Sequence, residues 1–276
     1  MKTLDNTTAI AIGGFDGMHV GHQHLFAELG ENGCIVVIET GYANLTPKEE
    51  RENFTHHPIV YFELDSIRHL DGNGFIKLLK EKFPLLAKIV VGYDFHFGKN
   101  RQCSFEDLKT IFDGEVVVVE EVSQKGDSIH SHKIRQKLTI GDIKGANAFL
   151  AHNYTVKGTH TTGQGIGKKE LVATINIETE GYLIPKEGVY ATLTQIDDEE
   201  HYHPSVSFVG HRVTTDGSFA IESHILDGEV CCEKRASISF ISFIRNNEKF
   251  NNLDELKQAI QKDIAIASKE LKLLQL

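Results

Sequence analysis

Two histidines beside a glycine-rich turn form the segment of this chain that is best suited to chemistry. The turn follows an apolar run over residues 8–12 and reads Gly-Gly-Phe-Asp-Gly-Met-His-Val-Gly-His over residues 13–22. His19 and His22 share one face at the start of a helix expected over residues 23–29. A strand, a glycine turn and a helix N-terminus form a phosphate site, because free backbone N–H groups and the helix dipole point toward the anion. Such histidines can also donate hydrogen bonds to charge that develops in a transition state.

The same segment allows two other interpretations. Histidines are common ligands of transition metals, although no Cys or carboxylate stands at ligand spacing beside this group. A structural turn with solvated histidines is the second alternative, in a chain that has 15 histidines. The His-x-Gly-His spacing itself is the pattern of nucleotidyl transferases, which move a nucleoside monophosphate from a triphosphate to an acceptor. Met18 and Phe26 are expected to pack in the core.

Composition limits the class of protein. A length of 276 residues is enough for two domains, and 40% hydrophobic with 25% charged residues is typical of a soluble globular protein. A net charge of −10 argues against a general nucleic-acid surface but allows a nucleotide site, which needs only local positive charge. The four cysteines form no C-x-x-C pair, and no apolar run approaches about 20 residues. We therefore expect reduced thiols, a cytoplasmic location and no membrane segment.

The two halves of the chain differ in periodicity. In the first half, strands expected over residues 34–38, 88–92 and 116–119 alternate with helices expected over residues 75–82 and 105–112. This alternation predicts a parallel sheet with helices on its faces, whose ligands bind at the carboxyl ends of the strands. Residues 13–22 and 92–98 should therefore lie on the same rim.

After about residue 153 the strands follow one another without intervening helices. Short β-rich runs separated by Gly, Asp, Asn and Pro occupy residues 154–158, 174–178, 188–196, 206–209, 219–227 and 236–245. Regularly spaced strands of this kind predict an antiparallel barrel or sandwich. An amphipathic helix over residues 253–274 closes the chain, with Asn252 as its N-cap and Glu255 completing a capping box. Residues 140–152 are expected to form the last helix of the first domain or the joint.

Several motifs, in order along nearly the whole chain, resemble those of the prokaryotic bifunctional riboflavin kinases/FAD synthetases. They are the glycine turn over 13–23, Val-Val-Gly-Tyr-Asp-Phe-His-Phe-Gly over 90–98, His-Ser-His-Lys-Ile-Arg over 130–135, the segment 153–167, Glu-Ser-His-Ile-Leu-Asp over 222–227, and the stretch 245–263. The resemblance implies a Rossmann-like α/β nucleotidyltransferase domain over 1–153, which would be the FMN adenylyltransferase (FAD synthetase). It also implies a riboflavin kinase-like antiparallel β-barrel with a C-terminal helix over 154–276.

This resemblance implies two consecutive ATP-dependent reactions. The second domain would phosphorylate riboflavin to FMN, and the first would transfer AMP from ATP to FMN, giving FAD and pyrophosphate. Mg²⁺ would offset the phosphate charge in both steps. The implied small-molecule partners are ATP, riboflavin, FMN and FAD, with no nucleic acid and no membrane.

The resemblance also assigns residues to the adenylylation site. His19 and His22 would contact the triphosphate and stabilise its charge, while Asp16 either orders the turn or approaches the metal. Asp94 would accept a hydrogen bond from adenine or ribose, or only cap the next turn. The residues expected to wrap ATP or balance its charge are Gly13, Phe15, Ser131, Lys133 and Arg135. Lys133 stands where the family usually has Arg, so the positive charge is kept but the two-pronged geometry is lost. His130 and His132 replace hydroxyl residues of the same motif.

The kinase-like half departs further from the family. The usual Gly-Phe-Pro-Thr-Ala-Asn reads Leu-Val-Ala-Thr-Ile-Asn over 171–176. Thr174 and Asn176 remain as the expected metal ligands, and alternation places both on one face of a strand. Ala173 replaces the proline, which would loosen the site. Glu222 is the candidate base for the riboflavin hydroxyl. Gly163 and Gly165, with a further glycine at 167, would form a phosphate-facing loop.

These departures leave two alternatives to a bifunctional enzyme. One is an FAD synthetase whose barrel binds flavin or regulates without kinase turnover. The other is a nucleotidyl transferase for a different acceptor, such as a pantetheine or glycerol phosphate, joined to an unrelated β domain. Separately, Thr174, Asn176 and Glu222 could be ordinary strand residues, although their match to the family weighs against the second of these alternatives. The usual Thr-Phe-x-Pro-His-Pro stretch is also missing, because residues 38–43 read Ile-Glu-Thr-Gly-Tyr-Ala, so flavin contacts from that loop are not carried over.

Overall fold

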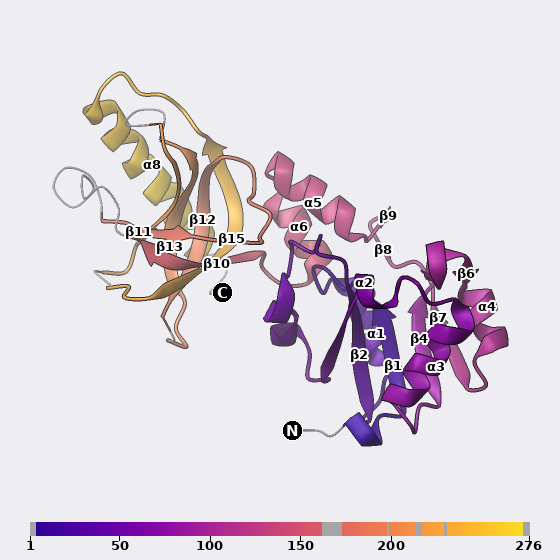
Figure 1. Cartoon of the computed structure of the whole chain (residues 1–276). Coiled ribbons are helices and arrows are strands. Elements are labelled where there is room, and N and C mark those ends of the chain that lie inside the picture. The colour runs from indigo at the N-terminus through magenta and orange to yellow at the C-terminus, as the bar shows by residue number, and fades with distance from the viewer. Residues whose placement is uncertain (1–3, 162–172, 198, 213–216, 229–230, 273–276) are drawn as a thin grey trace. The chain divides into compact units, whose positions relative to one another are not determined.

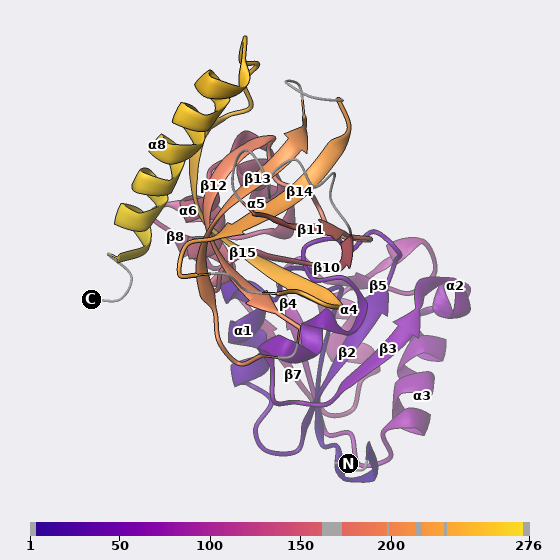
Figure 2. The same cartoon turned by 90° about the vertical axis from the view of Figure 1, so that its left-hand side faces the viewer.

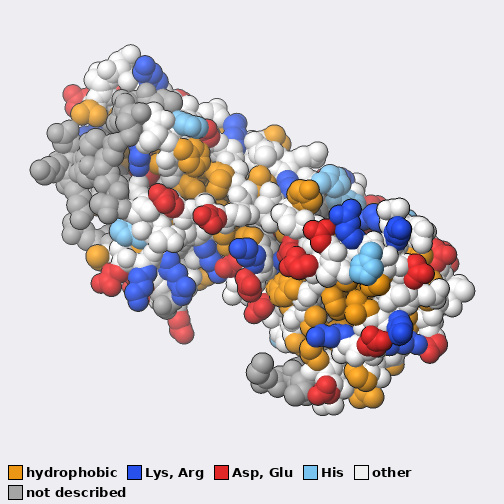
Figure 3. All heavy atoms as spheres, viewed as in Figure 1, with side chains coloured by type: hydrophobic (Ala, Val, Ile, Leu, Met, Phe, Trp, Pro, Cys, Tyr) orange, Lys and Arg blue, Asp and Glu red, His pale blue; other side chains and the backbone are white. Residues whose placement is uncertain are grey.

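A computed structural model of the chain describes residues 4–161, 173–197, 199–212, 217–228 and 231–272. It divides into two compact units, Met1–Ser131 and His132–Leu276 (Figures 1 and 2). On the face shown in Figure 3, acidic and basic side chains are interspersed over the described surface. The predicted boundary at 153/154 differs from this division and stays a prediction.

The first unit contains a five-stranded parallel sheet with the order β3-β2-β1-β4-β7. Its strands are β1 (Ala9–Gly13), β2 (Gly33–Glu39), β3 (Ile59–Glu63), β4 (Lys88–Gly92) and β7 (Glu115–Val119). The predicted parallel sheet is therefore confirmed, although β3 was not among the predicted strands. β1 lies at the centre beside β4, so the chain leaves both strands at the same edge of the sheet. The glycine turn after β1 and the turn after β4 share that rim.

Alternation along β1 decides which helix covers which face. Ile10 and Ile12 pack with helices α3 (Gly72–Lys82) and α4 (Phe105–Ile111) on one face. Ala9 and Ala11 pack with α1 (Val20–Ala27) on the other face, where small side chains leave room for the helix. Met18 and Phe26 are buried in that second cluster, as predicted.

Short elements complete the first unit and support the loops of the rim. They are η1 (Leu4–Asn6), η2 (Lys48–Phe54), α2 (Leu64–Ile67), β5 (His96–Phe97), η3 (Lys99–Arg101), β6 (Cys103–Ser104), β8 (Ser123–Gln124) and β9 (Asp127–Ser128). β5 pairs with β6 and β8 pairs with β9, each as a two-stranded antiparallel sheet.

Two helices precede the barrel where one was predicted. The helix expected over residues 140–152 is α6 (Ile143–Leu150), and a separate helix, α5 (Ser131–Ile140), ends before it. Gly141, at a φ of 86°, breaks the two helices apart, and the Asp142 side chain caps α6 by accepting from the Gly145 N–H at 3.0 Å. In the second unit Asn147 of α6 donates to the Phe240 carbonyl at 2.8 Å.

The second unit is a closed antiparallel barrel with the order β10-β11-β14-β13-β12-β15. Its strands are β10 (Thr155–Thr161), β11 (Ile175–Glu178), β12 (Gly188–Ile196), β13 (His203–His211), β14 (Phe219–Ile225) and β15 (Arg235–Asn246). Helix α8 (Leu253–Lys272) packs along β12 and β13 (Figure 2). The predicted cap is present, because Asn252 Oδ1 accepts from the Glu255 N–H at 2.9 Å. The predicted barrel is confirmed.

Removing α5 and α6 is expected to destabilise the barrel. Ala146 and Phe149 of α6 are buried, and Asn147 also accepts from the Tyr154 N–H at 2.8 Å. A fragment over 154–276 should therefore have a free energy of unfolding several kcal/mol lower than a fragment over 132–276, since burying one large side chain contributes about 1.5–3 kcal/mol. It should accordingly unfold at a lower urea concentration. Circular dichroism during urea titration measures both. Equal midpoints would support the boundary at 153/154 instead.

Candidate active sites in the two units

The glycine turn of the first unit is closed by an aromatic ring. An ideal Cβ on Gly13 would lie 2.9 Å from ring carbons of Phe15, so no side chain fits there. Phe15 has a φ of 46° and is 3% exposed, with its ring edge-on to His22 and Phe26 at centroid distances of 5.1 and 5.0 Å. The Phe15 side chain is buried against the His22 ring, and the expected part of this turn in wrapping ATP stays a prediction.

His19 and His22 form a stacked pair at the start of α1. Their ring centroids are 3.5 Å apart with an interplanar angle of 20°. His19 is the N-cap of α1, and its Nδ1 accepts from the His22 backbone N–H at 3.3 Å, so the helix begins before the predicted residue 23. Gly21 makes this possible, because a Cβ there would lie 3.2 Å from His19 Nδ1. With Nδ1 accepting, the proton of the neutral His19 ring is on Nε2.

Burial keeps both imidazoles neutral near pH 7. Burial, followed by the charge of His130, lowers the pKa of His19 from 6.5 to about 4. Burial and then the charges of His19, Arg51 and His130 lower the pKa of His22 well below its usual value. His19 is buried and His22 is half-buried, which argues against the solvated-turn alternative. Within the described part of the chain, no group of three or more His, Cys, Asp or Glu residues is placed to hold a metal ion.

The depressed pKa of His19 predicts acid sensitivity. His19 takes up a proton near pH 6.5 in the unfolded chain but only near pH 4 in the folded chain. The stability that comes from keeping His19 neutral is therefore fully present above pH 6.5 and is lost as the pH falls toward 4. His19→Asn keeps a capping side chain but has no proton to gain. Between pH 7 and about pH 4.5 the free energy of unfolding should fall in both proteins. The fall in the His19→Asn variant should be smaller than the fall in the wild type by about 2–3 kcal/mol.

Urea unfolding of the first unit at both pH values measures this difference. His24→Asn is the matched control, because His24 is exposed on the same helix. If His19→Asn loses as much stability as wild type on acidification, His19 is not held neutral by the fold.

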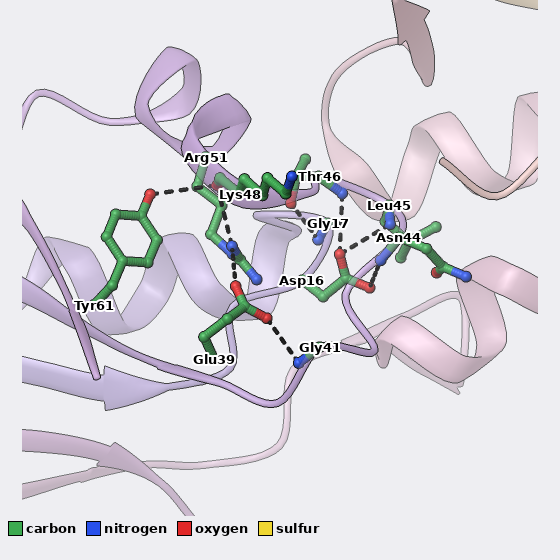
Figure 4. A network of polar contacts seen from close by, with 10 residues as sticks. All are labelled: Asp16, Gly17, Glu39, Gly41, Asn44, Leu45, Thr46, Lys48, Arg51 and Tyr61. Atoms are coloured by element: carbon green, nitrogen blue, oxygen red, sulfur yellow. Dashed lines mark hydrogen bonds and ion pairs between the residues drawn. The ribbon is translucent and has the colours of Figure 1, made fainter. Parts of the chain in front are cut away.

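Asp16 orders a neighbouring loop through its carboxylate (Figure 4). It accepts from the backbone N–H groups of Leu45 and Thr46 at 2.9 and 3.0 Å, and from Asn44 at 3.2 Å. The Gly17 N–H in turn donates to Thr46 Oγ1 at 2.8 Å. Of the two roles expected for Asp16, the geometry supports ordering the turn. This loop directly follows residues 38–43, where the family's Thr-Phe-x-Pro-His-Pro is missing.

A buried arginine lies beside the same loop and was not among the predicted site residues. Arg51 is 0% exposed, and its Nη1 donates to Glu39 at 3.0 Å and to the Lys48 carbonyl at 3.1 Å (Figure 4). Arg51 Nε is buried with no hydrogen-bond partner among the described residues. The guanidinium contributes positive charge near His22.

The end of β4 carries a polar cluster on the rim. Tyr93 donates to Glu121 Oε1 at 2.8 Å, which raises the pKa of Tyr93 to about 12. His130 Nε2 lies 3.1 Å from the same Glu121 oxygen. Asp94 follows Tyr93 in an exposed turn, and its backbone carbonyl lies 2.9 Å from His96 Nδ1. The Asp94 side chain is exposed, and its expected contact with adenine or ribose stays a prediction.

The third motif straddles the division between the units. Ser131 Oγ donates to the backbone carbonyl of Asp16 at 2.7 Å, which ties the motif to the glycine turn. Lys133 and Arg135 lie on α5 within the second unit. Their expected contact with triphosphate stays a prediction.

Register brings the predicted kinase residues together in the second unit. Asn176 of β11 stands directly opposite Glu222 of β14. Thr174 precedes β11, and its Oγ1 lies 3.5 Å from Asn176 Nδ2, so the two expected ligands are neighbours. Interior positions of β14 such as Ser223 are fully buried, which places Glu222 on the outer face of the barrel. Gly163 and Gly165 lie outside the described residues.

Arg212 connects these residues and was not predicted. Its Nη2 donates to Asn176 Oδ1 at 2.9 Å and its Nε donates to Glu222 Oε1 at 2.6 Å. The sequence carries no signal for Arg212, because the register that brings it to Glu222 is set by the pairing of β13 with β14. The oxygens of Thr174 and Asn176 are hard donors of the kind that Mg²⁺ prefers, and in this structure the Asn176 oxygen accepts from the Arg212 guanidinium.

Comparison with known proteins identifies the family. A family model described as FAD synthetase matches residues 1–38, and one described as riboflavin kinase matches residues 150–271. A Listeria monocytogenes protein named bifunctional riboflavin kinase/FMN adenylyltransferase is 30% identical, over 94% of this chain and 91% of its own. This chain belongs to the bifunctional riboflavin kinase/FMN adenylyltransferase family. Family members of the same name from Pseudomonas fluorescens and Escherichia coli are 28% and 26% identical, over 93% and 92% of this chain and 90% of each relative.

The resemblance drawn from the motifs is thus confirmed, and the riboflavin kinase match argues against an unrelated β domain. A crystal structure titled macrolide-efflux protein, from Streptococcus pneumoniae, has a TM-score of 0.83 at 23% identity, over 95% of this chain and 94% of that one, and shows the same fold. In the described part of this family member, none of the helices is both long and apolar enough to span a membrane.

Proposed function

We propose that this protein carries out two ATP-dependent reactions at two separate sites. The barrel phosphorylates riboflavin to FMN, and the first unit transfers AMP from ATP to FMN to give FAD. The observation that carries the proposal is the pairing of Asn176 with Glu222, beside Thr174, in a chain that also has the His19–His22 pair at a glycine turn. An FAD synthetase with an inactive barrel would have no need of that arrangement.

In the adenylylation site the protein supplies position and hydrogen bonds rather than a nucleophile. A phosphate oxygen of FMN attacks the α-phosphorus of ATP, and pyrophosphate leaves. His19 offers Nε2–H as a neutral donor whose direction is fixed by the helix cap. Fixed donors stabilise charge on the α-phosphoryl group and on pyrophosphate without reorganising during the reaction. Lys133 and Arg135 are proposed to balance the remaining phosphate charge, and Asp94 to meet adenine or ribose.

In the phosphorylation site Glu222 accepts the proton of the riboflavin hydroxyl as that oxygen attacks the γ-phosphorus of ATP, and the bond to the β–γ bridging oxygen breaks so that ADP leaves. Its carboxylate can do so because it faces outward and is partly exposed. Thr174 and Asn176 would hold the divalent cation, which we propose to be Mg²⁺. When bound, the cation neutralises phosphate charge. The free thiols of all four cysteines support the proposed cytoplasmic location.

Flavin separation tests the proposal directly. The protein is incubated with riboflavin, ATP and Mg²⁺, and the flavins are separated by chromatography. Both FMN and FAD should form from riboflavin, and FAD alone should form when FMN is supplied. Production of FAD from FMN with no FMN from riboflavin would instead show that the barrel is not a kinase.

A further inference from the structure

The guanidinium of Arg212 uses all three of its nitrogens at the phosphorylation site. Besides its bonds to Glu222 and Asn176, Nη1 donates to Ser218 Oγ at 2.8 Å. The side chains of Arg212 and Glu222 are only 19% and 21% exposed, and Asn176 is 9% exposed. A charge-assisted network with this little exposure is shielded less by water than a surface ion pair.

The backbone fixes Arg212 in this position. β13 and β14 pair with Phe208 opposite Glu222, and the pairing continues beyond the strands, since the Arg212 N–H donates to the Ser218 carbonyl at 2.9 Å. Arg212 is an even number of residues from Phe208, so period-two alternation places both side chains on the face that carries Glu222. The network is therefore a consequence of hairpin register.

Arg212 also stands where a second cation is needed. Asn176 Oδ1 is one of the two oxygens proposed to hold the metal, and it already accepts from Arg212 Nη2. Two cations on one oxygen repel each other strongly where water is partly excluded. A metal ion that binds Asn176 must therefore displace Nη2, while the bonds of Nε to Glu222 and of Nη1 to Ser218 can persist.

We propose that Arg212 is a positioning residue of the phosphorylation site. Before the metal and nucleotide bind, it holds Asn176 and Glu222 together as a placeholder cation. On binding it releases Asn176 to the metal and keeps the Glu222 carboxylate oriented toward the hydroxyl of the substrate. This proposal rests on the proposed kinase function of the barrel.

Loss of the placeholder should affect metal binding and turnover in opposite directions. Arg212→Gln should bind Mn²⁺ about tenfold more tightly, which is the scale of removing one hydrogen bond to a charged group. Its maximal rate of FMN formation should fall about tenfold because Glu222 is no longer oriented. Arg212→Lys keeps the positive charge but lacks the planar guanidinium with its several N–H donors, and it should shift the metal affinity much less. A purely structural role would lower the rate without tightening the metal.

The affinity is measured without turnover by titrating the full chain with Mn²⁺ in the presence of ADP. The electron paramagnetic resonance signal of free Mn²⁺ reports how much of the metal remains unbound. Metal held in the first unit is common to all variants and cancels in the comparison. Lys144→Gln, which removes one charge from an exposed ion pair of the same unit, is the matched control and should match wild type. The dependence of FMN formation on Mg²⁺ gives the half-saturation and the maximal rate, and FAD formation from FMN checks the first unit.

Unchanged or weaker Mn²⁺ binding by Arg212→Gln would overturn the proposal. Ser218→Ala provides a second test should that variant fail to fold, because it removes the hydroxyl that accepts from Nη1 and keeps the guanidinium. It should tighten Mn²⁺ about two- to threefold, and no change in a folded Ser218→Ala would count against the placeholder. A wild-type protein that makes no FMN would refute the kinase function, whereas the Mn²⁺ comparison would still report on Arg212.

Discussion

Replacement of His22 by Ala is expected to lower the rate of FMN adenylylation by roughly 10²-fold or more, the scale of losing one donor to a transition state. The ring lies at the start of α1, stacked on His19 and braced by Phe15. Loss of the His22 ring removes a hydrogen-bond donor and also the stacked ring that holds the orientation of His19. FAD formation from supplied FMN and ATP measures the effect.

Two controls accompany the His22 variant. His24→Ala removes an exposed imidazole from the same helix and should adenylylate FMN like wild type. Phosphorylation of riboflavin by His22→Ala should be nearly unchanged, because that chemistry belongs to the barrel. Full adenylylation activity in His22→Ala would show that the glycine turn is not the adenylylation site.

Replacement of Glu222 by Gln is expected to lower FMN formation from riboflavin by roughly 10²-fold or more, the range of general-base catalysis. Gln keeps the shape and can still meet Arg212, but it cannot take the hydroxyl proton. Conversion of FMN to FAD should remain intact, which separates a loss of chemistry from a loss of folding. The initial rate of FMN formation at saturating riboflavin and ATP is the measurement.

Glu178→Gln is the matched control, because Glu178 is an exposed carboxylate on β11 with no proposed role. The loss in Glu222→Gln should also exceed that in Arg212→Gln, since one removes the base and the other only its orientation. Equal losses would mean that Glu222 acts as a partner of Arg212 rather than as the base.

Short-range patterns in the sequence determined the elements and much of the site. Short continuous apolar runs predicted β1 and β4, and short β-rich runs bounded by turn residues predicted the barrel strands, because a buried strand needs an apolar run of only a few residues. The Asn252 cap was readable because capping depends on residues only a few positions apart. Spacing also placed His19 and His22 together at the start of a helix, and alternation placed Thr174 beside Asn176.

Contacts between residues distant in the chain were decided only by the tertiary structure. Asp16 holds backbone N–H groups about 30 positions away, and backbone donors leave no mark in a side-chain pattern. The burial of the Phe15 ring depends on a left-handed backbone at that residue and on its neighbours in α1. Arg212 acquires its role from the pairing of three strands, which brings Asn176 and Glu222 to it. Local periodicity identifies which face of a strand is buried, whereas the partner across that face is set by how the whole chain folds.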